Sequence, residues 1–473
     1  MTGVSRSQDL LQRLAATVSG EVTGPGSAGY DAGRSVWNAM IDRSPLAVVR
    51  ARDLGDVTPV VACAVQEGVP LAVRGGGHGV AGNGTVDGGI VLDLGSLRSV
   101  QVDAASATVT VAPGATLAEV DAATALHGLA VPVGVVSATG MAGLTLGGGF
   151  GWLTRAHGLT VDSLLAAEVV TASGTTVRAT SQENPDLLWA LKGGGGNFGV
   201  VTSFTFAAHP LPARVFCGNL VYTRPHWERA LHALAAWTED LPDEMTSIVT
   251  ALTPPPGWAM GTEPLLVVGF AWAGTDQAAG EACLATLTDQ APPDDREVGP
   301  TEWTAWQSAM DGLFPRGVRA YWKNTGFAHL DDDVIGILCT RAAEQTWQGT
   351  AFDVHHMGGA FARVRADATA FPDRASSFWL NVYGFWGDPE EDERNIAFVR
   401  GLARDMEPHS TGAQYVNFMG REAAGARAAD PWSAAMQVYG ESTLRRLAAV
   451  KHRFDPDNVF RLNHNIPPMA PES

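Results

Sequence analysis

Hydrophobic and polar residues follow two different patterns along the chain. Up to about residue 210, short apolar runs alternate with segments of helical period, which is typical of strands interleaved with helices. A capping box of Thr116 and Glu119 opens one helix, and Pro185 suits the first turn of another that ends before Gly193. The predicted strands are residues 46–50, 71–74, 89–94, 108–112, 166–171 and 175–179, with a further helix over 56–68.

After residue 210 the predicted strands become longer and antiparallel in character. They fall at 265–271, 317–327, 351–361 and 377–384, and helical segments fall at 275–289, 331–344, 391–405 and 441–454. This pattern predicts a sheet with helices on one face, distinct from the first half.

Glycine is concentrated in three loops that border predicted strands, at 74–78, 134–159 and 192–201. Backbone N–H groups in such loops bind phosphate oxygens, and the missing Cβ atoms let the backbone approach a flat ring. The glycines match neither a P-loop nor a Rossmann fingerprint. One such loop is most simply a tight turn, whereas three in half a chain predict a dinucleotide cradle.

The overall composition narrows the possible partners. A formal net charge of −18 and a pI near 5.0 argue against nucleic acid or an anionic membrane surface. No apolar run approaches a membrane span, and residues 1–20 predict an amphipathic helix rather than a signal peptide. Four scattered cysteines predict reduced thiols and a cytoplasmic protein, either a monomer or a homodimer. His355 and His356 should point to opposite faces of a strand, and no metal site is expected.

The run VRGGGHGVAGNGTVDGGIVLDL resembles the flavin loop of the vanillyl-alcohol-oxidase/PCMH superfamily, and more narrowly that of berberine-bridge-enzyme-like oxidases. GLTLGGGFGWLTRAHGLTVDSL, NPDLLWALKGGGGNFGVVTSF, YVNF and DPDNVFRLNHNIPP resemble later motifs of that family, in the same order. The resemblance implies the fold class α+β, with a two-part PCMH-type FAD domain and a substrate domain that has a large antiparallel sheet flanked by helices. The expected segments are an N-terminal helix and lead-in at 1–33, the FAD domain at 34–210, the substrate domain at 211–435 and a returning C-terminal segment at 436–473.

The same resemblance implies FAD bound covalently through His78. Many relatives add a cysteinyl bond, but Val136 stands at that position here, so a single tether is expected. This feature resembles the monocovalent bacterial subgroup that includes 6-hydroxynicotine oxidases and polyketide-tailoring flavoenzymes. The residues expected to bind FAD are Arg74, Gly75, Gly76, Gly77, His78, Gly79, Val135, Val136, Ser137, Gly140, Gly143, Gly147, Gly148, Gly151, Val201, Asn417, Asn463 and Asn465.

Candidate catalytic residues also follow from the resemblance. Tyr415 is the first candidate for proton acceptor, although it could instead only pack and hydrogen-bond the flavin; the second phenol of the family motif is Phe418 here. Thr139 and Leu144 flank the pocket where oxygen meets reduced flavin in relatives. Four aromatic residues on or beside the predicted strands are expected to divide between pocket and core: Tyr321, Trp322, Tyr383 and Trp386.

The leading hypothesis is an FAD-dependent oxidase that passes hydride from a small alcohol, amine or polyketide-type secondary metabolite to covalent flavin, with O2 giving H2O2. One alternative is a flavin-dependent enzyme that oxygenates or rearranges a polyketide. Another is a flavin-binding protein without catalysis. The residues of the substrate domain do not name the substrate.

Overall fold

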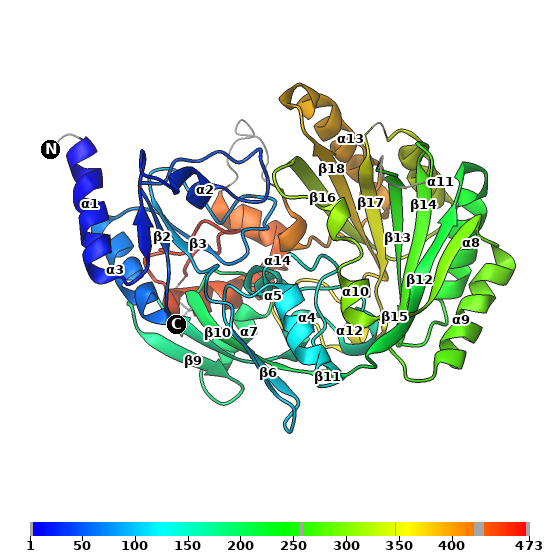
Figure 1. Cartoon of the computed structure of the whole chain (residues 1–473), viewed down its shortest axis with the longest axis horizontal. Helices are drawn as coiled ribbons and strands as arrows, with labels where there is room; N and C mark the ends of the chain where they lie inside the picture. Colours follow the sequence, from blue (N-terminus) through cyan, green and yellow to red (C-terminus); the bar gives the residue numbers. More distant parts are fainter. Residues whose placement is uncertain (1–2, 256–259, 346, 421–429, 470–473) are drawn as a thin grey trace.

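The computed structural model describes residues 3–255, 260–345, 347–420 and 430–469. Two small sheets with α1, α2 and α3 occupy one half of the molecule, and one large sheet occupies the other (Figure 1). Helix α14 lies between them in this view. The arrangement agrees with the change of pattern near residue 210.

The first half contains a mixed four-stranded sheet and an antiparallel five-stranded sheet. The four-stranded order is β1-β2-β4-β3, with β2, β4 and β3 parallel. Its strands are β1 (Glu21–Thr23), β2 (Ala47–Arg50), β3 (Leu71–Arg74) and β4 (Ile90–Asp93). The five-stranded order is β5-β6-β10-β8-β9, made of β5 (Val100–Asp103), β6 (Thr108–Val111), β8 (Leu164–Val170), β9 (Thr176–Thr180) and β10 (Val200–Ala207). A small pair joins β7 (Leu129–Ala130) to β11 (His209–Pro210).

Helices bury the apolar faces of these sheets. Leu10 and Leu14 of α1 pack with Val57 and Val60 of α3 over the parallel strands, as the amphipathic pattern predicts. The capping box at Thr116 and the hairpin between β8 and β9 are confirmed. The helices of this half are α1 (Gly3–Thr17), α2 (Tyr30–Arg34), α3 (Val57–Glu67), α4 (Leu117–Ala125), α5 (Met141–Gly147), α6 (Thr154–His157) and α7 (Pro185–Leu191).

The second half is built on a seven-stranded antiparallel sheet in the order β15-β12-β14-β13-β17-β18-β16. The strands are β12 (Arg214–Tyr222), β13 (Met245–Thr253), β14 (Leu265–Trp272), β15 (Asp295–Glu302), β16 (Arg319–Phe327), β17 (Gly349–His356) and β18 (Phe378–Trp386). The helices are α8 (Trp227–Thr238), α9 (Gln277–Gln290), α10 (Trp303–Gln307), α11 (Asp332–Ala343), α12 (Gly359–Arg363) and α13 (Asp392–Asp405).

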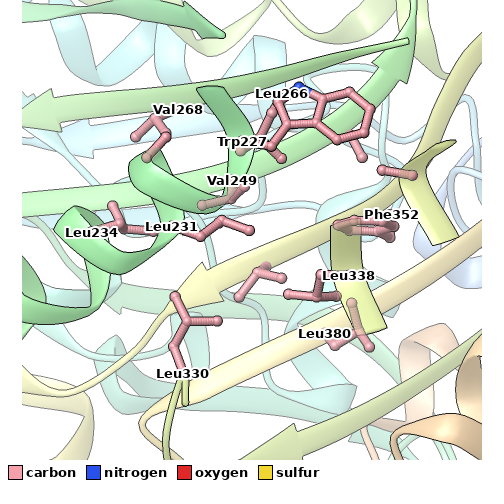
Figure 2. Packing of buried hydrophobic residues seen from close by; sticks show 14 of the residues in the cluster. Trp227, Leu231, Leu234, Val249, Leu266, Val268, Leu330, Leu338, Phe352 and Leu380 are labelled. Carbon is pink, nitrogen blue, oxygen red and sulfur yellow. The ribbon is translucent and has the colours of Figure 1, made fainter. Parts of the chain in front are cut away.

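Helices α8, α9, α11 and α13 cover one face of this sheet, as expected from the sequence. Figure 2 shows the packing: Trp227, Leu231 and Leu234 of α8 meet Val249, Leu266 and Val268 of the sheet. The opposite face turns toward the first half and is left to form the site described below.

The strand predicted at 351–361 is wrong at its C-terminal end. The strand stops at His356, because Gly358 and Gly359 take positive φ of 88° and 55° and turn the chain into α12. Phe361 is buried from that helix against Phe371, with ring centroids 6.2 Å apart. Its apolar character, which extended the predicted strand, therefore reflects a helix contact.

The chain returns to the first half through α14 (Pro431–Phe454), which is kinked at Gly440. Leu444 and Leu447 of this helix are buried in the core beneath the five-stranded sheet, together with residues of α7. No described helix is long and apolar enough to cross a membrane.

A candidate flavin site between the two halves

One large cavity lies where the three glycine loops meet the uncovered face of the seven-stranded sheet. The 74–79 loop, the start of α5, the 195–201 segment and the 415–419 turn all contribute to its wall. The residues predicted from the sequence that line it are Arg74, Gly75, Gly76, Gly77, His78, Gly79, Val135, Val136, Thr139, Gly140, Gly143, Leu144, Gly147, Val201, Tyr415, Asn417 and Asn463.

Four predicted cofactor residues lie outside this lining: Ser137, Gly148, Gly151 and Asn465. Ser137 instead binds Asp311, to which its N–H and its hydroxyl donate hydrogen bonds of 2.7 and 2.6 Å. A Cβ at Gly148 would lie 2.7 Å from the Phe371 ring, and one at Gly151 would lie 2.2 Å from a backbone carbonyl. These two glycines therefore allow close packing behind the wall.

Glycine in the first two loops allows their backbones to touch. A Cβ on Gly76 would lie 2.6 Å from the Gly140 backbone, so neither position tolerates a side chain. Arg74 closes the end of β3: its guanidinium donates to Asp93 at 2.8 Å and to backbone carbonyls of residues 33 and 35. Its charge is thus neutralised within the protein.

His78 has the properties that a covalent flavin attachment requires. It stacks on Trp37 with ring centroids 4.9 Å apart, and its Nε2 has no hydrogen-bond partner among the described residues. Burial lowers the pKa of His78 to about 4, so the imidazole is neutral at pH 7. A buried nitrogen without a partner is costly in a finished core. The residues present therefore fit an FAD whose isoalloxazine reaches His78.

Val136 lies in the cavity wall, and two residues of the second half of the molecule bind the loop on either side of it. Gln307 Nε2 donates to the Gly134 carbonyl at 3.0 Å, and Asp311 binds Ser137 as described above. Gln307 also donates to the buried carboxyl of Asp121 at 3.2 Å. No local sequence signal indicates these contacts, since they join residues more than 170 positions apart.

Tyr415 is almost fully buried, and its phenol oxygen accepts two hydrogen bonds. The donors are Gly149 N at 2.9 Å and Asn417 Nδ2 at 2.7 Å. Burial raises the pKa of Tyr415 to about 12, although both hydrogen bonds act in the opposite direction. Asn417 also donates to the Leu144 carbonyl at 3.0 Å, and Asn324 binds the Tyr415 backbone through both its N–H and its carbonyl. Tyr415 is therefore rigidly placed at the cavity wall.

The uncovered face of the sheet presents Trp322, Tyr383 and His355 to the cavity. Tyr321 and Trp386 belong to the core under the helices, so the predicted division of the four aromatic residues is confirmed. His355 and His356 do point apart: His356 contacts Arg155 at 3.3 Å on the side away from the cavity. Among the described residues, no cluster of His, Cys, Asp or Glu is arranged to hold a metal ion.

A row of polar residues crosses four strands beneath the cavity wall, and the sequence did not reveal it. Asn324, Asn381, Asp353 and Thr250 are successive register partners on β16, β18, β17 and β13. Asp353 is fully buried, accepts from Thr250 Oγ1 at 2.8 Å, and has its pKa raised by burial to about 7. Among the described residues, its Oδ2 has no hydrogen-bond partner, while the neighbouring Tyr383 hydroxyl lowers its pKa. Only strand register could have brought these residues together.

Comparisons with known proteins agree with this geometry. Residues 45–180 match the family model of the FAD binding domain, and residues 414–467 match the berberine and berberine-like model. The chain is 30% identical over 470 residues to the FAD-linked oxidoreductase YvdP of Bacillus subtilis, covering 95% of this chain and 98% of the relative.

Two solved structures have the same fold. 6-Hydroxy-D-nicotine oxidase from Arthrobacter nicotinovorans has a TM-score of 0.84 at 26% identity, with 96% of this chain and 98% of that chain covered. Glucooligosaccharide oxidase from Acremonium strictum has a TM-score of 0.84 at 23% identity, covering 98% and 99%, which supports the fold alone. The PCMH-type α+β fold expected from the sequence is thus confirmed. The chain belongs to the berberine-bridge-enzyme-like family of FAD-linked oxidoreductases.

Proposed function

We propose that this enzyme is an oxidase that removes hydride from a carbon atom of a small alcohol, amine or polyketide-type metabolite. The hydride passes to FAD tethered through His78 alone, and O2 regenerates the cofactor with release of H2O2. The observation that carries the proposal is the neutral imidazole of His78, whose Nε2 has no hydrogen-bond partner among the described residues, in the same cavity as Tyr383 and Thr139.

The residues of the cavity wall support a single tether. A nitrogen can attack only when it is unprotonated and uncommitted, and burial keeps His78 in that form. The glucooligosaccharide oxidase of the same fold carries a 6-S-cysteinyl, 8α-N1-histidyl FAD. In this chain Val136 lines the cavity and offers no thiol, and Gln307 and Asp311 hold its loop through hydrogen bonds.

Bound FAD supplies a hydride acceptor that O2 can reoxidise, so the chain must supply a proton acceptor. Tyr383 is better placed than Tyr415 to accept the substrate proton. A phenol with a high pKa can still relay a proton if a second group takes its own proton at the same time, and Asp353 lies behind Tyr383. In this relay the substrate hydroxyl proton moves to Tyr383 Oη and the Tyr383 proton moves to Asp353. The carbon loses hydride, and the product is a carbonyl compound.

Asp353 suits the terminal position of this relay. Its pKa of about 7 lies near physiological pH, where a general base combines availability with basicity. Its Oδ2 has no hydrogen-bond partner among the described residues and is therefore free to accept the Tyr383 proton. Tyr415, whose oxygen already accepts two N–H groups, would hold the substrate face of the flavin site in place.

Thr139 and Leu144 are proposed to border the path of oxygen to the reduced cofactor. Both line the cavity and are half-buried; Thr139 precedes α5 and Leu144 lies within it. The Thr139 carbonyl accepts a hydrogen bond from the Leu117 N–H at 2.9 Å, which fixes the backbone at this position.

The test is anaerobic titration of the purified flavoprotein with candidate alcohols, amines and polyketide fragments, followed by air. Bleaching of the flavin absorbance by a substrate and stoichiometric H2O2 on reoxidation are the expected results. Reduction followed by oxygen incorporation into the product, without peroxide, would replace the oxidase proposal with the oxygenating and rearranging alternative. If no candidate of any of these classes bleaches the flavin, the proposal fails.

A further inference from the structure

The substrate end of the cavity is lined mainly by aromatic rings. Trp322 and Tyr383 meet edge to face at 5.0 Å, Phe418 stacks on Trp322 at 5.3 Å, and Phe314 meets Tyr383 at 5.3 Å. Phe150 stacks on Phe418 at 6.0 Å from the loop that follows α5. Such walls favour a flat ring, which can offset-stack on one face and meet ring edges on the other.

The cavity contains almost no charge, although the protein carries a formal net charge of −18. Among its described lining residues, Arg74 alone has a permanently charged side chain, and Asp93 pairs with it at 2.8 Å. Burial lowers the pKa values of His78 and His355 to about 4 and about 3, so both imidazoles are neutral. An ammonium or carboxylate group on a ligand would lose its hydration here without touching a charged group of opposite sign in the cavity wall.

Hydrogen-bonding groups are also few at this end. Phe418 has no hydroxyl, the Tyr415 oxygen is already engaged twice, and Asn417 donates to two protein acceptors. Three groups of the sheet remain: Tyr383, the neutral imidazole of His355, and Trp322 Nε1, which is buried and has no partner among the described residues. A polyhydroxylated sugar would leave several of its hydroxyls without a partner, at about 1–3 kcal/mol each.

We propose that the substrate is an electrically neutral aromatic alcohol, with its ring against the stacked pair of Trp322 and Phe418 and its hydroxyl on Tyr383. This inference rests on the oxidase function proposed above and specifies its substrate class. Oxidation of such an alcohol releases one hydride to the bound FAD and one proton to Tyr383 and Asp353, and forms an aryl aldehyde or ketone.

Binding is tested separately from oxidation by using alcohols that cannot lose hydride. The probes are 2-aryl-2-propanols, whose carbinol carbon bears no hydrogen, with a para substituent that is methoxy, carboxylate or trimethylammonium. Cellobiose serves as the polyhydroxylated probe. Saturable perturbation of the flavin spectrum of the holoenzyme reports binding. The neutral probe should bind, and the two charged probes should bind at least about 100-fold more weakly.

Variants locate the site. Trp322→Leu should weaken binding of the neutral probe about tenfold, whereas Trp347→Leu, on the helix-covered side of the same sheet, should not change it. Phe418→Asp should raise the affinity for the trimethylammonium probe relative to the neutral one. Failure of the neutral probe to bind overturns the inference, as does equal binding of a charged probe or of cellobiose to the wild type. If the neutral probe binds but the matching primary alcohols neither bleach the flavin nor yield peroxide, the oxidase function fails and the recognition of neutral aryl groups stands.

Discussion

A buried ion pair lies at the C-terminal end of α14, and its lysine also binds the third glycine loop; its removal gives the sharpest stability prediction. Lys451 and Asp455 have no exposed side-chain surface and lie 2.5 Å apart. The Lys451 ammonium also donates to the carbonyls of Asn197 and Phe460 at 2.7 and 2.9 Å, so all its protons are used. Asp455 accepts the N–H groups of Val459 and Phe460, both at 2.8 Å.

Lys451→Met leaves a carboxylate buried without its counter-ion. Loss of one partner from such a pair costs about 3–5 kcal/mol. With an unfolding entropy of about 2.1 cal/mol/K per residue over the whole chain, this loss lowers the thermal midpoint by about 3–5 °C if the chain unfolds as one unit. Because Asn197 lines the flavin cavity, the flavin fluorescence of Lys451→Met should also begin to rise at a lower temperature than that of the wild type.

The assay is thermal unfolding followed by circular dichroism and by flavin fluorescence. Arg453→Met, at an exposed position of the same helix, is the control and should change stability by less than about 0.5 kcal/mol. The double variant Lys451→Met/Asp455→Asn removes both charges and should be more stable than Lys451→Met alone. If the double variant is as unstable as the sum of the two single variants, the buried charge is not the cause and the reasoning is refuted.

The remaining predictions concern the cofactor and the proton route. Wild-type protein should stay yellow after acid precipitation, with flavin on the His78 peptide alone, and His78→Ala should lose its flavin on denaturation; a flavin–cysteine peptide would contradict the single tether. Tyr383→Phe should slow anaerobic flavin reduction by about 10²–10⁴-fold and leave reoxidation unchanged in stopped-flow absorbance, whereas Thr139→Val should slow reoxidation only. Tyr415→Phe separates the two roles considered for that residue. If it slows flavin reduction as much as Tyr383→Phe does, Tyr415 is the proton acceptor. Since burial raises the pKa of Asp353 to about 7, its contribution to stability is complete below the ordinary aspartate pKa near 4 and is lost as pH rises toward 7. Asp353→Asn should therefore gain stability relative to wild type at pH 8 but not at pH 4. In the wild type, the rate of flavin reduction should rise near pH 7 as Asp353 loses its proton, and this rise should be absent from Asp353→Asn. A rise retained in the variant would exclude Asp353 as the terminal acceptor.

The local elements of this protein follow from short-range physical preferences in the sequence. The helix at 57–67 needs only its apolar spacing and the glycine that ends it, and the β8–β9 hairpin needs only alternation around a Ser-Gly turn. The glycine loops can be recognised for the same reason, since the need for close backbone approach excludes every other residue. The motif around His78 and the valine at position 136 are likewise visible in the sequence alone. The predicted domain limits near residues 34, 210 and 435 stay predictions, as does the single tether.

The chemistry of the cavity depends on contacts between residues far apart in the chain. Asp353, Asn381 and Asn324 are isolated polar residues in apolar strands, and only the antiparallel register of β16, β18 and β17 places them in one row. Burial of that row raises the pKa of Asp353, and no sequence pattern encodes burial of a particular carboxyl group. Gln307 and Asp311 likewise reach the Val136 loop only because the two halves of the molecule pack together. The fold class and the cofactor class could be predicted from the sequence, because both depend on backbone geometry and local motifs. The polar row and the uncharged aromatic chamber could not, because solvent exclusion and strand register are properties of the assembled chain.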